Sequence, residues 1–96
     1  MEGYTPVPCQ DFRKICEEVR SEIVRAVSLH GSMKSQHEVY AVILEGLDEF
    51  WDLVKINPKK LNYDDAKKRL QNMRNELIQT SAMCIRAIHD LGLEDA

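Results

Sequence analysis

Residues 36–56 read QHEVYAVILEGLDEFWDLVKI, and their apolar and acidic side chains separate on a helical wheel. At 100° per residue, one broad arc carries the apolar and aromatic side chains and the other carries most of the acids. Ser35 and Glu38 have the spacing of a capping box at the start of this stretch. Pro58 stops the pattern, because the residue before a proline avoids helical geometry. The sequence therefore predicts a helix over about residues 36–56.

Two further stretches have helical periodicity, at about residues 9–30 and 63–90. In the first, apolar residues recur every three or four positions. In the second, Asn62 is a suitable N-cap and Gly92 follows the last periodic residue. The three helices predict an all-α protein, an antiparallel helical bundle that forms a single domain over residues 1–96.

The helix over residues 36–56 is apolar around more than half of its circumference. Two neighbouring helices rarely cover so wide an arc, and a chain of this size buries only about 60–65% of its unfolded surface. We therefore expect a homo-oligomer, either a homodimer or a higher assembly, which completes the helical bundle.

Composition excludes several classes of partner. The chain of 96 residues carries 13 Lys and Arg against 16 Asp and Glu, a formal charge of −3, so we expect no nucleic acid polymer as a partner. No apolar run approaches the length of a membrane span. The three cysteines form no CxxC pair, and the first residues lack the pattern of a signal peptide. We therefore expect reduced thiols and a cytoplasmic location, with no membrane partner.

Acidic residues gather on the helix over residues 36–56. Glu45 and Glu49 are four apart, and so are Asp48 and Asp52. Like charges at this spacing each cost a few tenths of a kcal/mol, roughly 0.2–0.5. The pattern is typical of a solvated face, and it also fits a site for a hard cation that prefers oxygen ligands.

Two short segments resemble motifs of a known family. Residues 44–50, LEGLDEF, resemble the E-E-x-x-E motif of the MazG-like all-α nucleoside triphosphate pyrophosphohydrolases. Residues 76–79, ELIQ, stand where that family carries E-x-x-D on its next long helix. The YAVIL lead-in before the first motif and the small residues after the second also match. The resemblance covers about residues 10–91.

The resemblance implies a Mg²⁺-dependent hydrolase that converts a nucleoside triphosphate to a monophosphate and pyrophosphate. It implies Glu49 and Glu76 as the catalytic residues. The implied metal-binding set is Glu45, Glu49, Glu76 and Gln79. Two positions depart from the family pattern, because Gly46 replaces the second glutamate of the first motif and Gln79 replaces the aspartate of the second. A glycine within a helix costs about 1 kcal/mol relative to alanine, so Gly46 indicates either a close helix contact or a lost ligand.

The basic residues Lys59, Lys60 and Lys67 lie around the start of the third predicted helix. They are candidates for contacting the triphosphate, and the alternative is a solvated basic patch. Asp52, three residues after Glu49, is a candidate replacement for a missing acid. The alternative to the enzyme is a non-catalytic helical module of the same type, which binds a nucleotide or a protein partner after its catalytic site has degenerated.

Overall fold

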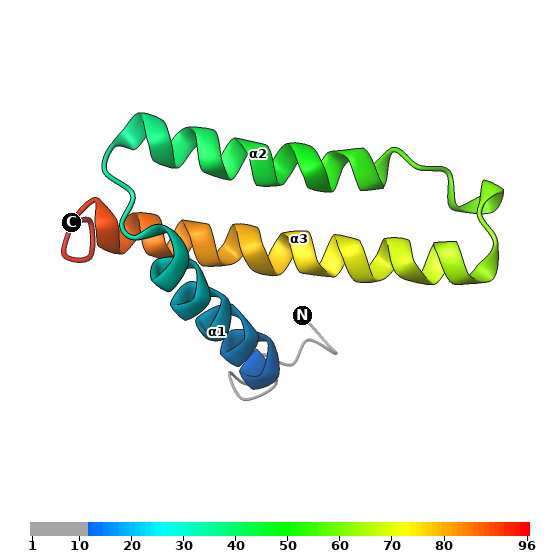
Figure 1. Cartoon of the computed structure of the whole chain (residues 1–96), viewed down its shortest axis with the longest axis horizontal. Helices are drawn as coiled ribbons and strands as arrows, with labels where there is room; N and C mark the ends of the chain where they lie inside the picture. Colours follow the sequence, from blue (N-terminus) through cyan, green and yellow to red (C-terminus); the bar gives the residue numbers. More distant parts are fainter. Residues whose placement is uncertain (1–11) are drawn as a thin grey trace, which may run out of the picture.

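The computed structural model describes residues 12–96, and within this part every regular element is a helix (Figure 1). The elements are α1 (Arg13–His30), α2 (Gln36–Val54), the short 3₁₀ helix η2 (Pro58–Lys60) and α3 (Tyr63–Asp90). The predicted all-α class is confirmed. The predicted start of the first helix at residue 9 lies outside the described residues. None of the helices over residues 12–96 has the length and apolarity that a membrane crossing requires.

Helix α2 begins where the capping pattern predicts. The backbone N–H of Glu38 donates to Ser35 Oγ at 3.0 Å, and the Glu38 carboxylate accepts from the backbone N–H of Lys34 at 3.0 Å. At the other end, Arg69 Nε donates to the carbonyl of Leu53 at 2.8 Å. This bond satisfies one of the free carbonyls of the last turn. Helix α2 therefore ends at Val54, two residues before the predicted boundary.

Helix α3 spans the residues that the sequence pattern predicts. Asn62 accepts a hydrogen bond from the backbone N–H of Asp65 at 2.8 Å, which caps the first turn. After Asp90 the chain turns through Gly92, whose φ of 68° lies in the left-handed region that favours glycine. The result is a 28-residue helix long enough to carry both other helices.

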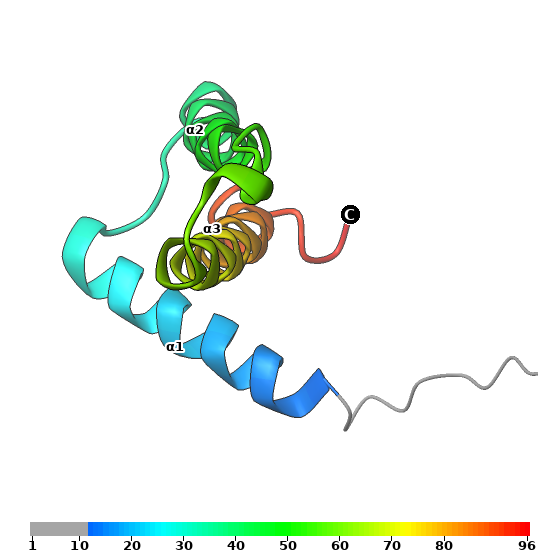
Figure 2. The same cartoon turned by 90° about the vertical axis from the view of Figure 1, so that its right-hand side faces the viewer.

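The helices form two packed pairs around α3 rather than a closed bundle. Helices α2 and α3 run antiparallel, and α1 crosses α3 at an angle (Figure 1). Viewed along α3, helices α2 and α1 lie on different sides of it (Figure 2). Both α1 and α2 pack against α3, so α3 is the central element of the fold.

Gly46 lies at a close approach between α2 and α3. A Cβ atom at this position would lie 2.5 Å from Oγ1 of Thr80, far inside van der Waals contact. The two backbones are close because this residue has no side chain. Of the two interpretations of Gly46 offered by the sequence, the structure supports the close helix contact.

The core of the described residues is small. Its buried apolar residues are Val19, Ala26, Met33, Val39, Ala82 and Ala87, and none of the described large side chains is fully buried. Many large apolar side chains on all three helices remain exposed. Completion of the bundle by oligomerisation stays a prediction, and the exposed apolar side chains are the physical reason to expect it.

Candidate functional site

A cleft of about 570 Å³ opens where α1, α2 and α3 meet the loop that joins α1 to α2. Glu45 and Glu49 of α2 line it, together with Glu76 and Gln79 of α3. These are the residues that the resemblance nominates as metal ligands. The structure therefore brings the predicted set to one cleft, although its members come from two helices.

Helix geometry explains this convergence. Glu45 and Glu49 are one turn apart, so both lie on the same side of α2. Glu76 is four residues before Thr80, which contacts Gly46, so its side chain also lies on the face of α3 that meets α2. The antiparallel packing places the acids of the two helices opposite each other.

The carboxyl groups of Glu76 and Glu49 interact directly. The pKa of Glu76 is raised above its usual value, first by burial, then by hydrogen bonding with Glu49, and further by the negative charges of Glu49 and Glu45. Oε2 of Glu76 is buried without a hydrogen-bond partner. The cleft thus holds an uncompensated acid pair, which a proton or a cation would stabilise.

A second orphaned group lies in the same cleft. Oγ1 of Thr80 is buried and has no hydrogen-bond partner, and Thr80 lines the cleft beside Gly46. A buried hydroxyl without a partner costs free energy, on the order of 1–3 kcal/mol. The wall between α2 and α3 therefore offers unsatisfied oxygens from both Glu76 and Thr80.

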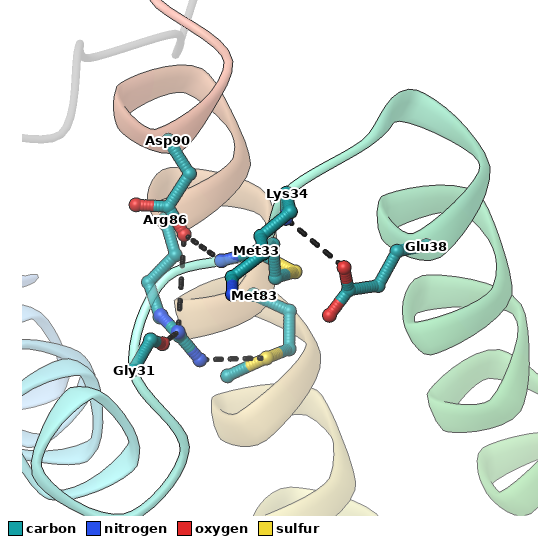
Figure 3. Close-up of polar contacts among 7 residues, drawn as sticks. All are labelled: Gly31, Met33, Lys34, Glu38, Met83, Arg86 and Asp90. Atoms are coloured by element: carbon teal, nitrogen blue, oxygen red, sulfur yellow. Dashed lines mark hydrogen bonds and ion pairs between the residues drawn. The ribbon is translucent and has the colours of Figure 1, made fainter.

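The opposite end of the cleft is basic. Arg86 of α3 lines it and is only 4% exposed. Its guanidinium donates to the carbonyl of Gly31, contacts the sulfur of Met83 at 3.7 Å and lies 3.8 Å from the carboxylate of Asp90 (Figure 3). Asp90 in turn accepts from the backbone N–H of Met33 at 2.8 Å. We call the buried pair Arg86–Asp90 with these two loop contacts the loop clasp.

The loop clasp ties α3 to the segment between α1 and α2. Residues 31–35 have no regular structure, so their backbone groups need partners from elsewhere. Arg86 supplies a donor for one of these groups, and Asp90 supplies an acceptor for another. Because α1 ends and α2 begins at this loop, the clasp fixes where both helices leave α3. Nε of Arg86 is itself buried without a partner.

Helix α1 closes the third side of the cleft with Glu22, Arg25, Ala26 and His30. Arg25 pairs with Glu22 on the same helix, with Nε at 2.9 Å from a carboxylate oxygen. Further along, Glu18 of α1 accepts from Arg74 of α3 at 2.9 Å, which links the two helices across their crossing. The charged groups of α1 are therefore held at the rim by pairs of their own.

The predicted phosphate-binding lysines are not part of this cleft. Lys59 and Lys60 lie in η2, and Lys67 lies in the second turn of α3. All of them are exposed and sit at the end of the α2–α3 pair where η2 joins the two helices (Figure 1). Asp52, the candidate replacement acid, points to solvent and pairs with Lys55 at 3.0 Å. The cleft thus omits the lysines and Asp52.

Sequence reasoning missed the loop clasp and Thr80. On a helical wheel, an arginine is normally assigned to the solvated face, and Arg86 does not interrupt the apolar stripe of α3. The sequence does contain one signal of a buried ion pair: Arg86 and Asp90 are four residues apart and have the small residues Ala82 and Ala87 nearby. Small neighbours permit the close packing that buries such a pair.

Within residues 12–96, no group of three or more His, Cys, Asp or Glu side chains is arranged as a metal-binding set. The acids of the cleft therefore contribute a close pair, Glu49 and Glu76, with Glu45 nearby. Comparison with known proteins gives no match to a family model, to a curated protein or to a solved structure.

Proposed function

We propose that this chain is a Mg²⁺-dependent nucleoside triphosphate pyrophosphohydrolase of MazG-like type, which releases a nucleoside monophosphate and pyrophosphate. The observation that carries the proposal is the convergence of Glu49 and Glu76 from two helices on one cleft. The short motifs around these residues, 44–50 and 76–79, nominate the same pair. Arginines at the other side of the cleft suit a ligand with negative charge.

The donor set is compatible with Mg²⁺ held in part by its substrate. Mg²⁺ usually binds one or two carboxylates and completes its shell with water and substrate phosphates. Glu49 and Glu76 would be these carboxylates, with Glu45 and the amide oxygen of Gln79 beside them. Oε2 of Glu76 is buried without a hydrogen-bond partner, so it is free to coordinate the ion. The bound ion would neutralise phosphate charge and lower the pKa of a water nucleophile.

The acidic and basic side chains of the cleft would have different roles in the reaction. Glu49 and Glu76, as ligands of the ion, would hold it and position a metal-bound water. The raised pKa of Glu76 in the chain without an ion reflects the nearby negative charges of Glu49 and Glu45, which a cation would compensate. Arg25 and Arg86 line the part of the cleft formed by α1 and the clasped loop. Arg86 is buried and bound to Asp90 and Gly31, so Arg25 is the one that would contact phosphate oxygens, by exchanging its pairing with Glu22 for them.

A second candidate function is a non-catalytic module that binds a nucleotide or a protein partner. One observation favours it: the position of the family's second glutamate is Gly46, packed so closely against Thr80 that a larger side chain has no room. The described residues accordingly supply fewer acids than the family motif. Such a site would bind a nucleotide through the arginines without hydrolysing it.

Pyrophosphate release from a panel of nucleoside triphosphates with Mg²⁺ tests the proposal. We expect turnover by the wild type and at least about a hundredfold loss in Glu49→Gln and Glu76→Gln, a typical effect of removing a metal ligand. The matched control is Asp52→Asn, which removes an exposed acid of α2 outside the cleft. Full activity in the glutamine variants would overturn the site assignment.

Thermal melting separates the two candidate functions. A ligand at ten times its Kd stabilises the folded chain by about 1.4 kcal/mol, which raises Tm. Stabilisation by Mg²⁺ with a non-hydrolysable triphosphate, combined with no turnover, would select the non-catalytic module. If the chain shows no turnover and no stabilisation by Mg²⁺ with the triphosphate, both nucleotide proposals are wrong.

A further inference from the structure

Helices α2 and α3 expose large apolar side chains that the described structure leaves uncovered. Tyr40 is 68% exposed, Leu70 60% and Trp51 56%, and Leu44, Leu47 and Leu77 are each at least 40% exposed. Single exposed apolar residues are common on soluble proteins. A contiguous group of them is not, and such a group marks an interaction surface.

These side chains lie on one side of the α2–α3 pair. Measured around α2 from Gly46, which faces Thr80, Tyr40, Leu44, Leu47 and Trp51 stand at about 100–160°. Measured around α3 from Thr80, which faces Gly46, Leu70 and Leu77 stand at about 60–80° in the same sense. Each angle is measured about the helix's own axis, from the residue that faces the other helix. In two antiparallel helices, positive angles measured in this way point to the same side of the pair. We call this surface, formed by these residues, the apolar face.

The acidic cleft lies on the other side of the α2–α3 pair. Around α2, Glu45 and Glu49 stand at about −60 to −100°, opposite in sense to the apolar face. The loop of residues 31–35, which borders the cleft, also leaves the pair on one side only (Figure 2). The apolar face is therefore free of both α1 and the cleft.

The area of the apolar face is comparable with one half of a stable interface. With about 200 Å² for each large apolar or aromatic side chain, its exposed fractions amount to roughly 650 Å². A standard interface buries about 800 Å² on each partner, rim included. None of the described large side chains is fully buried within one chain, so this face is the natural place for the missing core.

We propose that the apolar face binds the apolar face of a second copy of this chain. The two α2–α3 pairs then pack face to face as a four-helix layer with twofold symmetry, and the acidic clefts open outward on opposite sides. A second copy is the favoured occupant because the face bears no carboxylate, so two chains of net charge −3 can meet there with their acids turned away. Each cleft would then be built by α1, α2 and α3 of a single chain.

Light scattering coupled to size-exclusion chromatography and analytical ultracentrifugation test this proposal without any nucleotide. We expect the wild type at twice the 11.1 kDa mass of the chain. The double variant Leu47→Glu/Leu77→Glu places like charges on both copies and should weaken the dimer at least a hundredfold. The control is Val24→Glu, which alters a side chain of α1 that is 61% exposed and lies outside the apolar face.

Mixing variants of opposite charge distinguishes loss of the interface from loss of the fold. The Glu double variant combined with Leu47→Lys/Leu77→Lys should recover a heterodimer, whichever positions meet across the twofold axis. A wild-type monomer at every concentration, or a Glu double variant as dimeric as Val24→Glu, would overturn the proposal. Failure to recover the mixed dimer would do the same. None of these outcomes depends on hydrolysis or on Mg²⁺.

Discussion

Gly46 of α2 lies against Thr80 of α3 so closely that a Cβ atom at position 46 would come within 2.5 Å of the threonine hydroxyl. This contact sets the distance between the helices beside the acid pair. Because Glu49 is three residues after Gly46 and Glu76 is four before Thr80, the contact also determines whether their carboxyl groups meet.

Substitution of Gly46 by alanine should therefore destabilise the protein, despite the higher helix propensity of alanine. The gain in propensity is about 1 kcal/mol, whereas overpacking costs about 1–3 kcal/mol. We expect a net loss of about 1 kcal/mol in urea denaturation. Thr80→Ala removes the hydroxyl that a Cβ at 46 would meet.

The double variant Gly46→Ala/Thr80→Ala should recover stability to the wild-type level or above, because the clash is gone and the propensity gain remains. A double-mutant cycle measures this coupling directly. Additive effects of the two substitutions would show that the helices do not touch at this point.

Protonation of Glu76 should link the stability of the fold to pH. Its pKa is raised in the folded state by burial and by Glu49 and Glu45, so the folded chain binds a proton more tightly than the unfolded chain. The stabilisation is complete below the usual glutamate pKa near 4.5 and is lost as pH rises through the higher folded value. Above that pH range, the ionised Glu76 carboxylate lowers the free energy of unfolding.

We therefore expect Glu76→Gln to raise Tm at pH 7 by roughly 2–5 °C and to have a much smaller effect at pH 4. Melting curves between these two pH values, monitored by circular dichroism, measure the effect. The matched variant Asp52→Asn, at an exposed acid, should show no such dependence. An equal shift of Tm at both pH values would contradict the assignment of a raised pKa to Glu76.

The loop clasp should contribute far more to stability than an exposed ion pair on the same helix. Arg86→Met leaves the Asp90 carboxylate buried, with side chains at this pair only 4% and 5% exposed, and loses the bond to Gly31. Removal of one member of a buried pair costs about 3–5 kcal/mol. Urea denaturation of Arg86→Met should show a loss of this size.

Arg74→Met is the natural comparison, because Arg74 pairs with Glu18 while both side chains are well exposed. An exposed pair is worth about 0–1 kcal/mol, so this variant should lose little. The clasp hypothesis also predicts that Arg86→Met/Asp90→Leu recovers part of the loss, since no buried charge is then left alone. Equal losses in the Arg86 and Arg74 variants would contradict it.

The sequence predicted the helices well and the site in part. Ser35, Asn62 and Gly92 mark helix ends through local hydrogen bonds and backbone freedom, which require no knowledge of the tertiary structure. Glu49 and Glu76 were paired through short motifs, and the structure places both in one cleft. The path of α1 was beyond prediction, because it depends on Arg86 and Asp90, whose burial follows from packing.

The cluster of Lys59, Lys60 and Lys67 illustrates the opposite case. These residues are close in sequence and lie where η2 joins α2 to α3, whereas Glu49 and Glu76 lie further along the two helices, in the cleft. One turn of helix advances the chain by about 5.4 Å, so the two or more turns between Lys67 and Glu76 separate the two groups by more than 10 Å. Charge clustering alone does not report this distance.

The position of α3 at the centre of the fold affects how the cleft can move. Helices α1 and α2 each pack on α3 and are joined to each other by the loop of residues 31–35. The width of the cleft thus depends on the angle between α1 and α3, which the Glu18–Arg74 pair holds at the crossing and Arg86 holds at the loop. A ligand that bridges α1 and the acid pair would therefore enter a cleft whose walls are already in place, so little of the binding free energy would be lost to rearrangement.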